Sequence, residues 1–239
     1  DCGSETSADF VVKPFLRAQG INTLPNLALT HGDQRRVGGF KLVATEFQPR
    51  LTFTSPIRPR SPTYRDALKQ LETAPSRWKT VSATDHVLSW EVLHPAATDK
   101  FDRADDNALV LRGKFHGTRV LLLSELGAAG QRALLARGGD LGADIVVAGL
   151  PEQGEPLADD LLAAIQPRVI VLTDADFPVT KRTRPALVAR LSRSGATVLR
   201  LTETGSVTLR LTSSSTDVQT TGGRIVATLP AARAALPAR

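Results

Sequence analysis

The chain has 239 residues, of which 41% are hydrophobic and 23% charged, values that are ordinary for a soluble globular protein with a sizeable core. Its single cysteine excludes an internal disulfide framework and a zinc cluster built from cysteines, and no apolar run approaches the roughly 20 residues that span a bilayer. The formal net charge of +6 favours a polyanionic partner over a cationic one.

The first half of the sequence predicts alternating helices and strands. Residues 1–3 resemble the end of a strand, and a helix beginning near Ser7 and interrupted by Pro14 ends at Gly20. Residues 24–30 form a buried strand pattern that leads into a polar loop at His31. The following segments are a helix at 37–47, a strand at 51–54, a proline-rich loop at 55–63, a helix at 64–73, strands at 79–83 and 87–93, and a charged loop at 99–106.

The second half continues with a β-hairpin and then a regular alternation. Residues 107–115 and 118–123 are separated by the turn dipeptide His116-Gly117. The remaining predicted elements are helices at 131–137, 157–165 and 185–194 and strands at 144–148, 169–173, 197–202 and 206–211. We therefore expect one mixed α/β domain over residues 1–212, followed at 213–239 by a disordered tail that is rich first in Ser, Thr and Gly and then in Ala, Pro and Arg.

The loop at His31 carries a family resemblance. Residues 27–39, which include His31, Asp33 and Gly38-Gly39, resemble the metallo-β-lactamase signature T-H-x-D-x-D-H-x-G-G. Several further phrases occur in the order found in the C-terminal domain of ComEC-type DNA-internalisation competence proteins, which the chain resembles more narrowly. These phrases are residues 1–3, 13–21, 106–111, 121–125, 142–147, 166–171 and 184–191.

This resemblance implies a metallo-β-lactamase-like αβ/βα four-layer sandwich whose first strands lie upstream of Asp1. The sequence contains no methionine, so we expect a domain of a longer protein. The resemblance implies a soluble domain attached to a bacterial inner-membrane protein, on the extracytoplasmic side, whose partners are the upstream channel segments and single-stranded DNA.

The positions that bind metal in the resembled family are only partly retained. His31, Asp33 and Glu125 remain as possible ligands, whereas Arg35, Arg36, Arg184 and the pair Leu150-Pro151 stand at the other ligand positions. An arginine stays protonated and has no acceptor lone pair, so it cannot ligate a metal. Because a two-metal hydrolytic site needs a full ligand set for each ion, we expect no catalytic residues and no bound metal.

A group of cations suggests two interpretations, which the sequence leaves open. The group consists of Arg35, Arg36, Lys181, Arg182 and Arg184. The arginines at the former ligand positions, Arg35, Arg36 and Arg184, could pair with Asp33 and Glu125 and hold the loops of a degenerate site without metal. All five cations could instead line a cationic cleft that binds the phosphates of single-stranded DNA.

Two other functions remain as alternatives. One is a metal-dependent nuclease or phosphodiesterase with an altered zinc or manganese site made of His31, Asp33 and Glu125. The other is a structural or protein-interaction domain. The remaining histidines, His86, His94 and His116, are expected to be surface or hydrogen-bonded structural residues, and Asp174 and Asp176 to be solvated turn residues.

Overall fold

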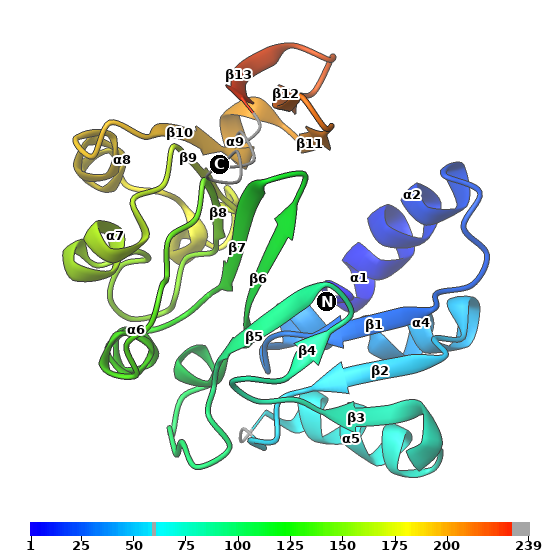
Figure 1. Cartoon of the computed structure of the whole chain (residues 1–239). Coiled ribbons are helices and arrows are strands. Elements are labelled where there is room, and N and C mark those ends of the chain that lie inside the picture. The colour runs from blue at the N-terminus through cyan, green and yellow to red at the C-terminus, as the bar shows by residue number, and fades with distance from the viewer. Residues whose placement is uncertain (59–60, 231–239) are drawn as a thin grey trace, which may run out of the picture. The chain divides into compact units, whose positions relative to one another are not determined.

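The computed structural model describes residues 1–58 and 61–230, which form two compact units: residues 1–110 (unit 1) and the residues from 111 onward (unit 2). The ribbon in Figure 1 follows the elements along the chain by colour. Both units combine helices with strands, so the prediction of a mixed α/β chain is confirmed. Residues 1–212, which the sequence predicts to form one domain, are divided between these two units.

Unit 1 begins with a helical segment and contains a parallel sheet. The segment consists of α1 (Glu5–Ser7), the π-helical turn η1 (Ala8–Val12) and α2 (Lys13–Ala18). The sheet has the order β1 (Asn26–Leu29), β2 (Leu51–Thr54) and β3 (Trp78–Thr80), and both pairings are parallel. Parallel neighbours need crossover connections. These are supplied by α3 (Gln34–Val37) with α4 (Phe40–Phe47), and by α5 (Pro62–Glu72) with η2 (Pro75–Arg77).

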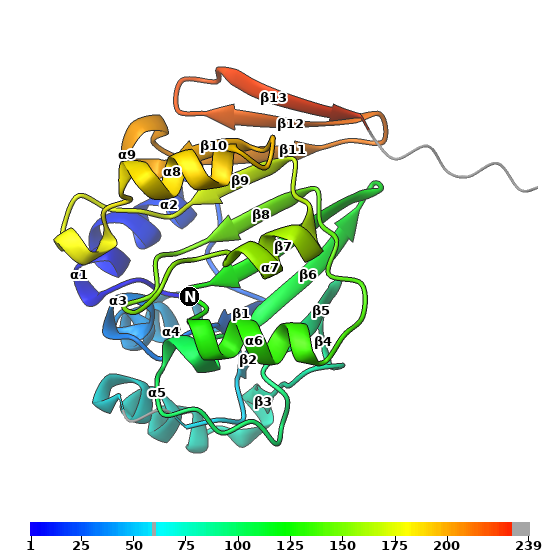
Figure 2. The ribbon, with the colours of Figure 1, turned by 90° about the vertical axis from the view of Figure 1, so that its left-hand side faces the viewer.

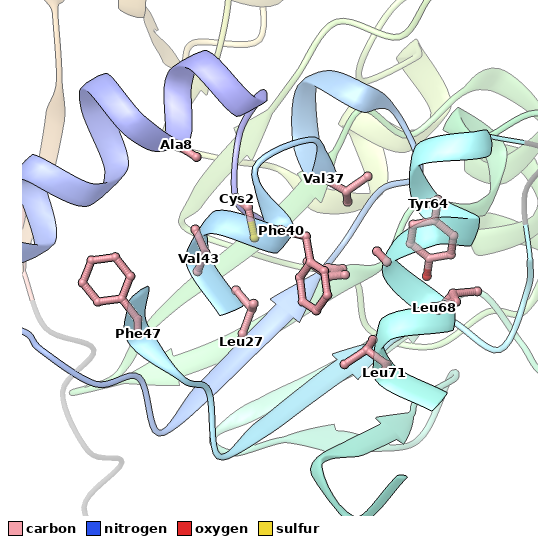
Figure 3. Packing of buried hydrophobic residues seen from close by; sticks show 12 residues of the cluster. Cys2, Ala8, Leu27, Val37, Phe40, Val43, Phe47, Tyr64, Leu68 and Leu71 are labelled. Atoms are coloured by element: carbon pink, nitrogen blue, oxygen red, sulfur yellow. The ribbon is translucent and has the colours of Figure 1, made fainter. Parts of the chain in front are cut away.

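The core of unit 1 forms where the crossover helices pack on β1. Figure 3 shows apolar side chains of β1, α4 and α5 gathered in one cluster, together with Cys2 and Ala8 from the start of the chain. Burial of this cluster is the main driving force for folding of the unit. The clustered residues with the least exposure include Leu29, Val43, Phe47 and Tyr64.

Residues 1–3 do not form a strand, contrary to the prediction. They pack instead on the turn before α4, where the Cys2 N–H donates to the Arg36 carbonyl and the Gly39 N–H to the Gly3 carbonyl. A Cβ at Gly39 would collide with Ala8 and with the Cys2 carbonyl. Gly39 is therefore required for close packing between the first residues and the His31 loop region.

The rest of unit 1 consists of short elements. The single strand predicted at 87–93 is in fact two antiparallel strands, β4 (His86–Val87) and β5 (Trp90–His94), because the chain turns at Leu88, whose φ is 56°. The charged loop that follows contains the 3₁₀ turn η3 (Asp105–Asn107).

Unit 2 is built on strands in the order β10-β9-β8-β7-β6. The predicted hairpin is confirmed: β6 (Val110–Phe115) and β7 (Thr118–Ser124) pair antiparallel around His116-Gly117. The neighbours β7, β8 (Ile145–Ala148), β9 (Val169–Leu172) and β10 (Thr197–Arg200) are all parallel. The helices α6 (Ala128–Ala136), α7 (Asp159–Ile165) and α8 (Pro185–Ser192) cover one face of these strands (Figure 1).

The end of the described chain forms a second sheet in unit 2. After α9 (Leu201–Thr204), the strands β11 (Val207–Leu211), β12 (Ser215–Thr220) and β13 (Ile225–Pro230) pair antiparallel, as Figure 2 shows. The prediction of disorder from residue 213 is therefore wrong for residues 215–230, where buried Val218 and Thr216 alternate with less buried residues. The last part of the predicted tail, 231–239, lies outside the described residues.

Candidate functional site

The His31 loop follows β1, as the sequence predicts, and its side chains are hydrogen-bonded within unit 1. The Asp33 N–H donates to His31 Nδ1 at 3.0 Å, so Nδ1 is the acceptor and the ring proton lies on Nε2. His31 Nε2 lies 3.0 Å from an Asp105 carboxylate oxygen, and both residues are buried. Both imidazole nitrogens of His31 are thus already engaged.

Asp33 caps a helix and binds the neighbouring arginine. Its carboxylate accepts the Arg35 N–H at 2.7 Å, which caps α3, and the Arg35 Nε–H at 3.2 Å. Partial burial acts to raise the pKa of Asp33, but the backbone and side-chain hydrogen bonds from Arg35 outweigh it and hold the pKa below its usual value. Arg35 therefore pairs with Asp33, as the first interpretation of the cations expects. Arg36 is half-buried in the same short helix.

Glu125 is bound by a lysine in unit 2. Glu125 directly follows β7, and Lys181 ends the 3₁₀ turn η4 (Val179–Lys181). Lys181 Nζ donates to Glu125 Oε2 at 2.7 Å and to the Leu150 carbonyl at 2.5 Å. Only 5% of Lys181 and 4% of Glu125 are exposed, so this ammonium does not face solvent. The proposal of Lys181 as a phosphate-binding residue is therefore corrected: its charge is used inside the unit.

Two of the predicted cations of unit 2 lie at the surface. Arg182 and Arg184 are both exposed, and Arg184 is the N-cap residue of α8. The Arg182 Nη2 group donates to the Asp176 carbonyl at 3.1 Å and lies 3.8 Å from the Asp176 carboxylate. These two guanidinium groups remain accessible to an anionic partner.

Asp174 is not a solvated turn residue, contrary to expectation. It is buried, and its carboxylate accepts the Thr202 N–H at 3.0 Å and the Thr202 hydroxyl at 2.9 Å. These bonds fix the end of β9 to the start of α9. Asp176, two residues later, is exposed as expected.

The other histidines are structural or exposed, as expected. His94 is fully buried, and its Nε2–H donates to the Asp106 carbonyl at 2.8 Å. His86 and His116 lie at the surface.

The candidate ligands His31, Asp33 and Glu125 all make polar contacts with residues of their own unit. In unit 1, His31 Nδ1 accepts a backbone N–H, and Asp33 accepts several N–H groups of Arg35. In unit 2, the Lys181 ammonium on Glu125 would repel a cation at that carboxylate.

Sequence reasoning missed two of these interactions. Asp105, the partner of His31, lies 74 residues further along the chain in a run of charged residues, and the sequence predicted only a charged loop there. The pairing of Lys181 with Glu125 spans 56 residues, and no local pattern joins them.

No protein-family model matches the chain, and comparison with curated proteins finds no match. Among the residues that the structure describes, no helix combines the length and the apolar character needed to cross a bilayer.

Proposed function

We propose that this chain is a non-catalytic metallo-β-lactamase-like domain, with a αβ/βα sandwich, in which side-chain cations take the place of metal ions. We further propose that it belongs to a ComEC-type DNA-uptake protein of the bacterial inner membrane and contacts the phosphates of single-stranded DNA. The observation that carries this proposal is the position of the Lys181 ammonium between Glu125 and the Leu150 carbonyl.

The chemistry of this lysine supports a structural role for the former ligand positions. By resemblance, Glu125 and Leu150 stand where the family has metal ligands. The Lys181 ammonium supplies a positive charge and two hydrogen bonds to oxygens at these positions. A buried carboxylate without a cationic partner would be strongly disfavoured, so Lys181 stabilises the loops that a metal would otherwise hold.

The His31 loop in unit 1 is also stabilised by contacts between its own residues. Asp33, a ligand in the resembled signature, caps α3 and pairs with Arg35 at 3.2 Å. The loop is thus held by a helix cap and an ion pair without metal.

Contact with DNA is supported by charge and exposure. The chain carries a formal net charge of +6, and Arg182 and Arg184 are exposed at the start of α8. A guanidinium group binds phosphate oxygens through paired N–H donors. The partners that this proposal implies are single-stranded DNA and the channel segments of the same protein.

The experiment is a binding titration of the 239-residue chain with a fluorescent single-stranded oligonucleotide at several salt concentrations. Removing one phosphate contact should lower the slope of log affinity against log salt by about 0.7. We expect this change for Arg182→Ala and for Arg184→Ala. The matched control is Arg132→Ala, which removes an exposed cation from α6 and should leave the slope unchanged.

A second candidate function has one observation in its favour. His31 and Asp105 keep an imidazole and a carboxylate 3.0 Å apart in a buried position, and zinc and manganese bind both groups. A metal-dependent nuclease would cleave the oligonucleotide after zinc or manganese is added, and such cleavage would overturn the non-catalytic proposal. A chain that neither binds nor cleaves it would instead be a structural or protein-interaction domain.

A further inference from the structure

The loop between β9 and α8 presents an aromatic side chain to solvent. Phe177 is 86% exposed, the largest fraction among the big hydrophobic side chains that the structure describes, and Val179 is 72% exposed. Exposing a phenyl ring to water is unfavourable, so a partner that covers this ring would gain from its burial.

This loop is fixed at both ends by buried polar groups. At its start, Asp174 is bound to Thr202, and the Ala175 N–H donates to the Lys181 carbonyl at 2.9 Å. At its end, the Lys181 side chain is held by Glu125. The exposed tip at Phe177 therefore projects from an anchored base.

Two exposed guanidinium groups follow the aromatic ring in the sequence. The hydrogen bond from Arg182 to the Asp176 carbonyl places a guanidinium beside the residue that precedes Phe177. Arg184, two residues after Arg182, is also exposed. An aromatic platform with neighbouring cations is the combination by which proteins bind single-stranded nucleic acid, because bases stack on the ring while the cations follow the phosphates.

We infer that Phe177 is a stacking platform for an unpaired base of single-stranded DNA, with Arg182 and Arg184 on the adjacent phosphates. This inference rests on the proposed function and specifies which side chain distinguishes single-stranded from double-stranded DNA. A duplex keeps its bases stacked on one another and offers no free base face, so the ring selects single strands.

The charges of the loop favour this partner over a bilayer surface. Asp176, directly before Phe177, has a side chain that is 81% exposed. Insertion of Phe177 into a bilayer would bring this carboxylate into the headgroup region, where anionic lipids repel it. A single base stacking on the ring leaves Asp176 in water.

The test compares two oligonucleotides with the same backbone, one of thymidines and one of abasic deoxyribose phosphates. For the thymidine strand, Phe177→Ala should weaken binding on the order of tenfold, while Phe177→Trp should keep it. For the abasic strand, Phe177→Ala should change nothing, since no base is there to stack. The control Phe15→Ala removes a ring from unit 1 that is 62% exposed and should leave both affinities unchanged.

The outcomes separate this inference from the function on which it rests. If the unaltered chain binds neither strand at low salt, the proposed DNA contact fails. If it binds both and Phe177→Ala binds the thymidine strand as tightly as the unaltered chain, the arginines suffice and the stacking inference is overturned. Loss of binding to phosphatidylglycerol vesicles by Phe177→Ala, with unchanged thymidine binding, would overturn it in favour of a membrane contact.

Discussion

The Lys181 ammonium lies 2.7 Å from a carboxylate oxygen of Glu125, and both side chains are buried in unit 2. The same ammonium donates to the Leu150 carbonyl, so one cation joins the end of β7, the end of β8 and the loop after β9. These are the chain segments from which parallel sheets commonly present ligands to a metal or substrate. Here they converge on a side chain of the protein itself.

Replacing Lys181 should destabilise the protein severely. Lys181→Met removes the ammonium that binds the buried Glu125 carboxylate, and breaking a buried ion pair by removing one partner typically costs about 3–5 kcal/mol. The free energy of unfolding, measured by urea denaturation, should fall by this amount. The double variant Lys181→Met with Glu125→Leu should recover part of the loss, because it removes both charges.

The control for this prediction is Arg182→Met, which alters the adjacent exposed cation and should change stability by no more than about 0.5 kcal/mol. Equal effects of Lys181→Met and Arg182→Met would show that the buried pair does not hold the loop.

The bond between His31 and Asp105 gives a second stability prediction. Asp105→Ala leaves the buried His31 Nε2–H without this acceptor, and an unsatisfied buried donor costs about 1–3 kcal/mol. Thermal and urea unfolding of the variant should both report the loss. Asp102→Ala, an exposed neighbour, should cost at most about 0.5 kcal/mol, and an equal loss in both variants would contradict the assigned bond.

Asp33 should make the stability of the fold depend on pH in a defined direction. Because hydrogen bonds from Arg35 hold its folded pKa below the usual value of 3.8, the carboxylate stabilises the fold at neutral pH and loses this contribution as pH falls through the folded pKa. Asp33→Asn keeps a capping side chain but removes the charge. The stability difference between the unaltered chain and the variant should therefore shrink between about pH 5 and pH 2. A difference that stays constant over this range would contradict the assignment.

The ionisation of Tyr64 at alkaline pH can be followed directly, because Tyr64 is the only tyrosine in the chain. Burial raises the pKa of Tyr64 to about 12, against smaller opposing contributions from hydrogen bonds to Thr54 and Ser55. Its contribution to stability is complete below the unfolded pKa near 10 and is lost as pH rises through about 12. Ultraviolet absorbance of the phenolate should appear near pH 12 in the folded chain and near pH 10 in urea. Absorbance that rises near pH 10 without unfolding would contradict burial of the ring.

Much of the element order could be predicted because it depends on local pattern. The hairpin at His116-Gly117 was predicted correctly, since both turn residues adopt the positive φ that such dipeptides favour, 48° and 86°. The alternation from β7 to β10 followed from short apolar runs bounded by turns. The strands after residue 213 were missed because their composition resembles a low-complexity tail, while their burial depends on pairing with β11 and on Thr216, which bonds to Thr118.

The candidate site could be predicted only where its residues are adjacent in sequence. His31, Asp33 and Arg35 lie in one strand–loop–helix pattern, and the structure places them at the end of β1 in that order. The partners Asp105 and Lys181 come from distant loops, and their roles depend on tertiary packing, which residue patterns do not encode. The same packing decides that Lys181 is buried while Arg182 is exposed.

The most direct test of the account is the metal content of the purified 239-residue chain. The chain would be equilibrated with zinc and with manganese, freed of unbound ions by gel filtration, and measured by elemental analysis. If Lys181 and Arg35 take the place of metal ions, far less than one ion per chain should remain. One or two tightly retained ions per chain would contradict the proposed replacement of metal by side-chain cations and would indicate metal-dependent chemistry.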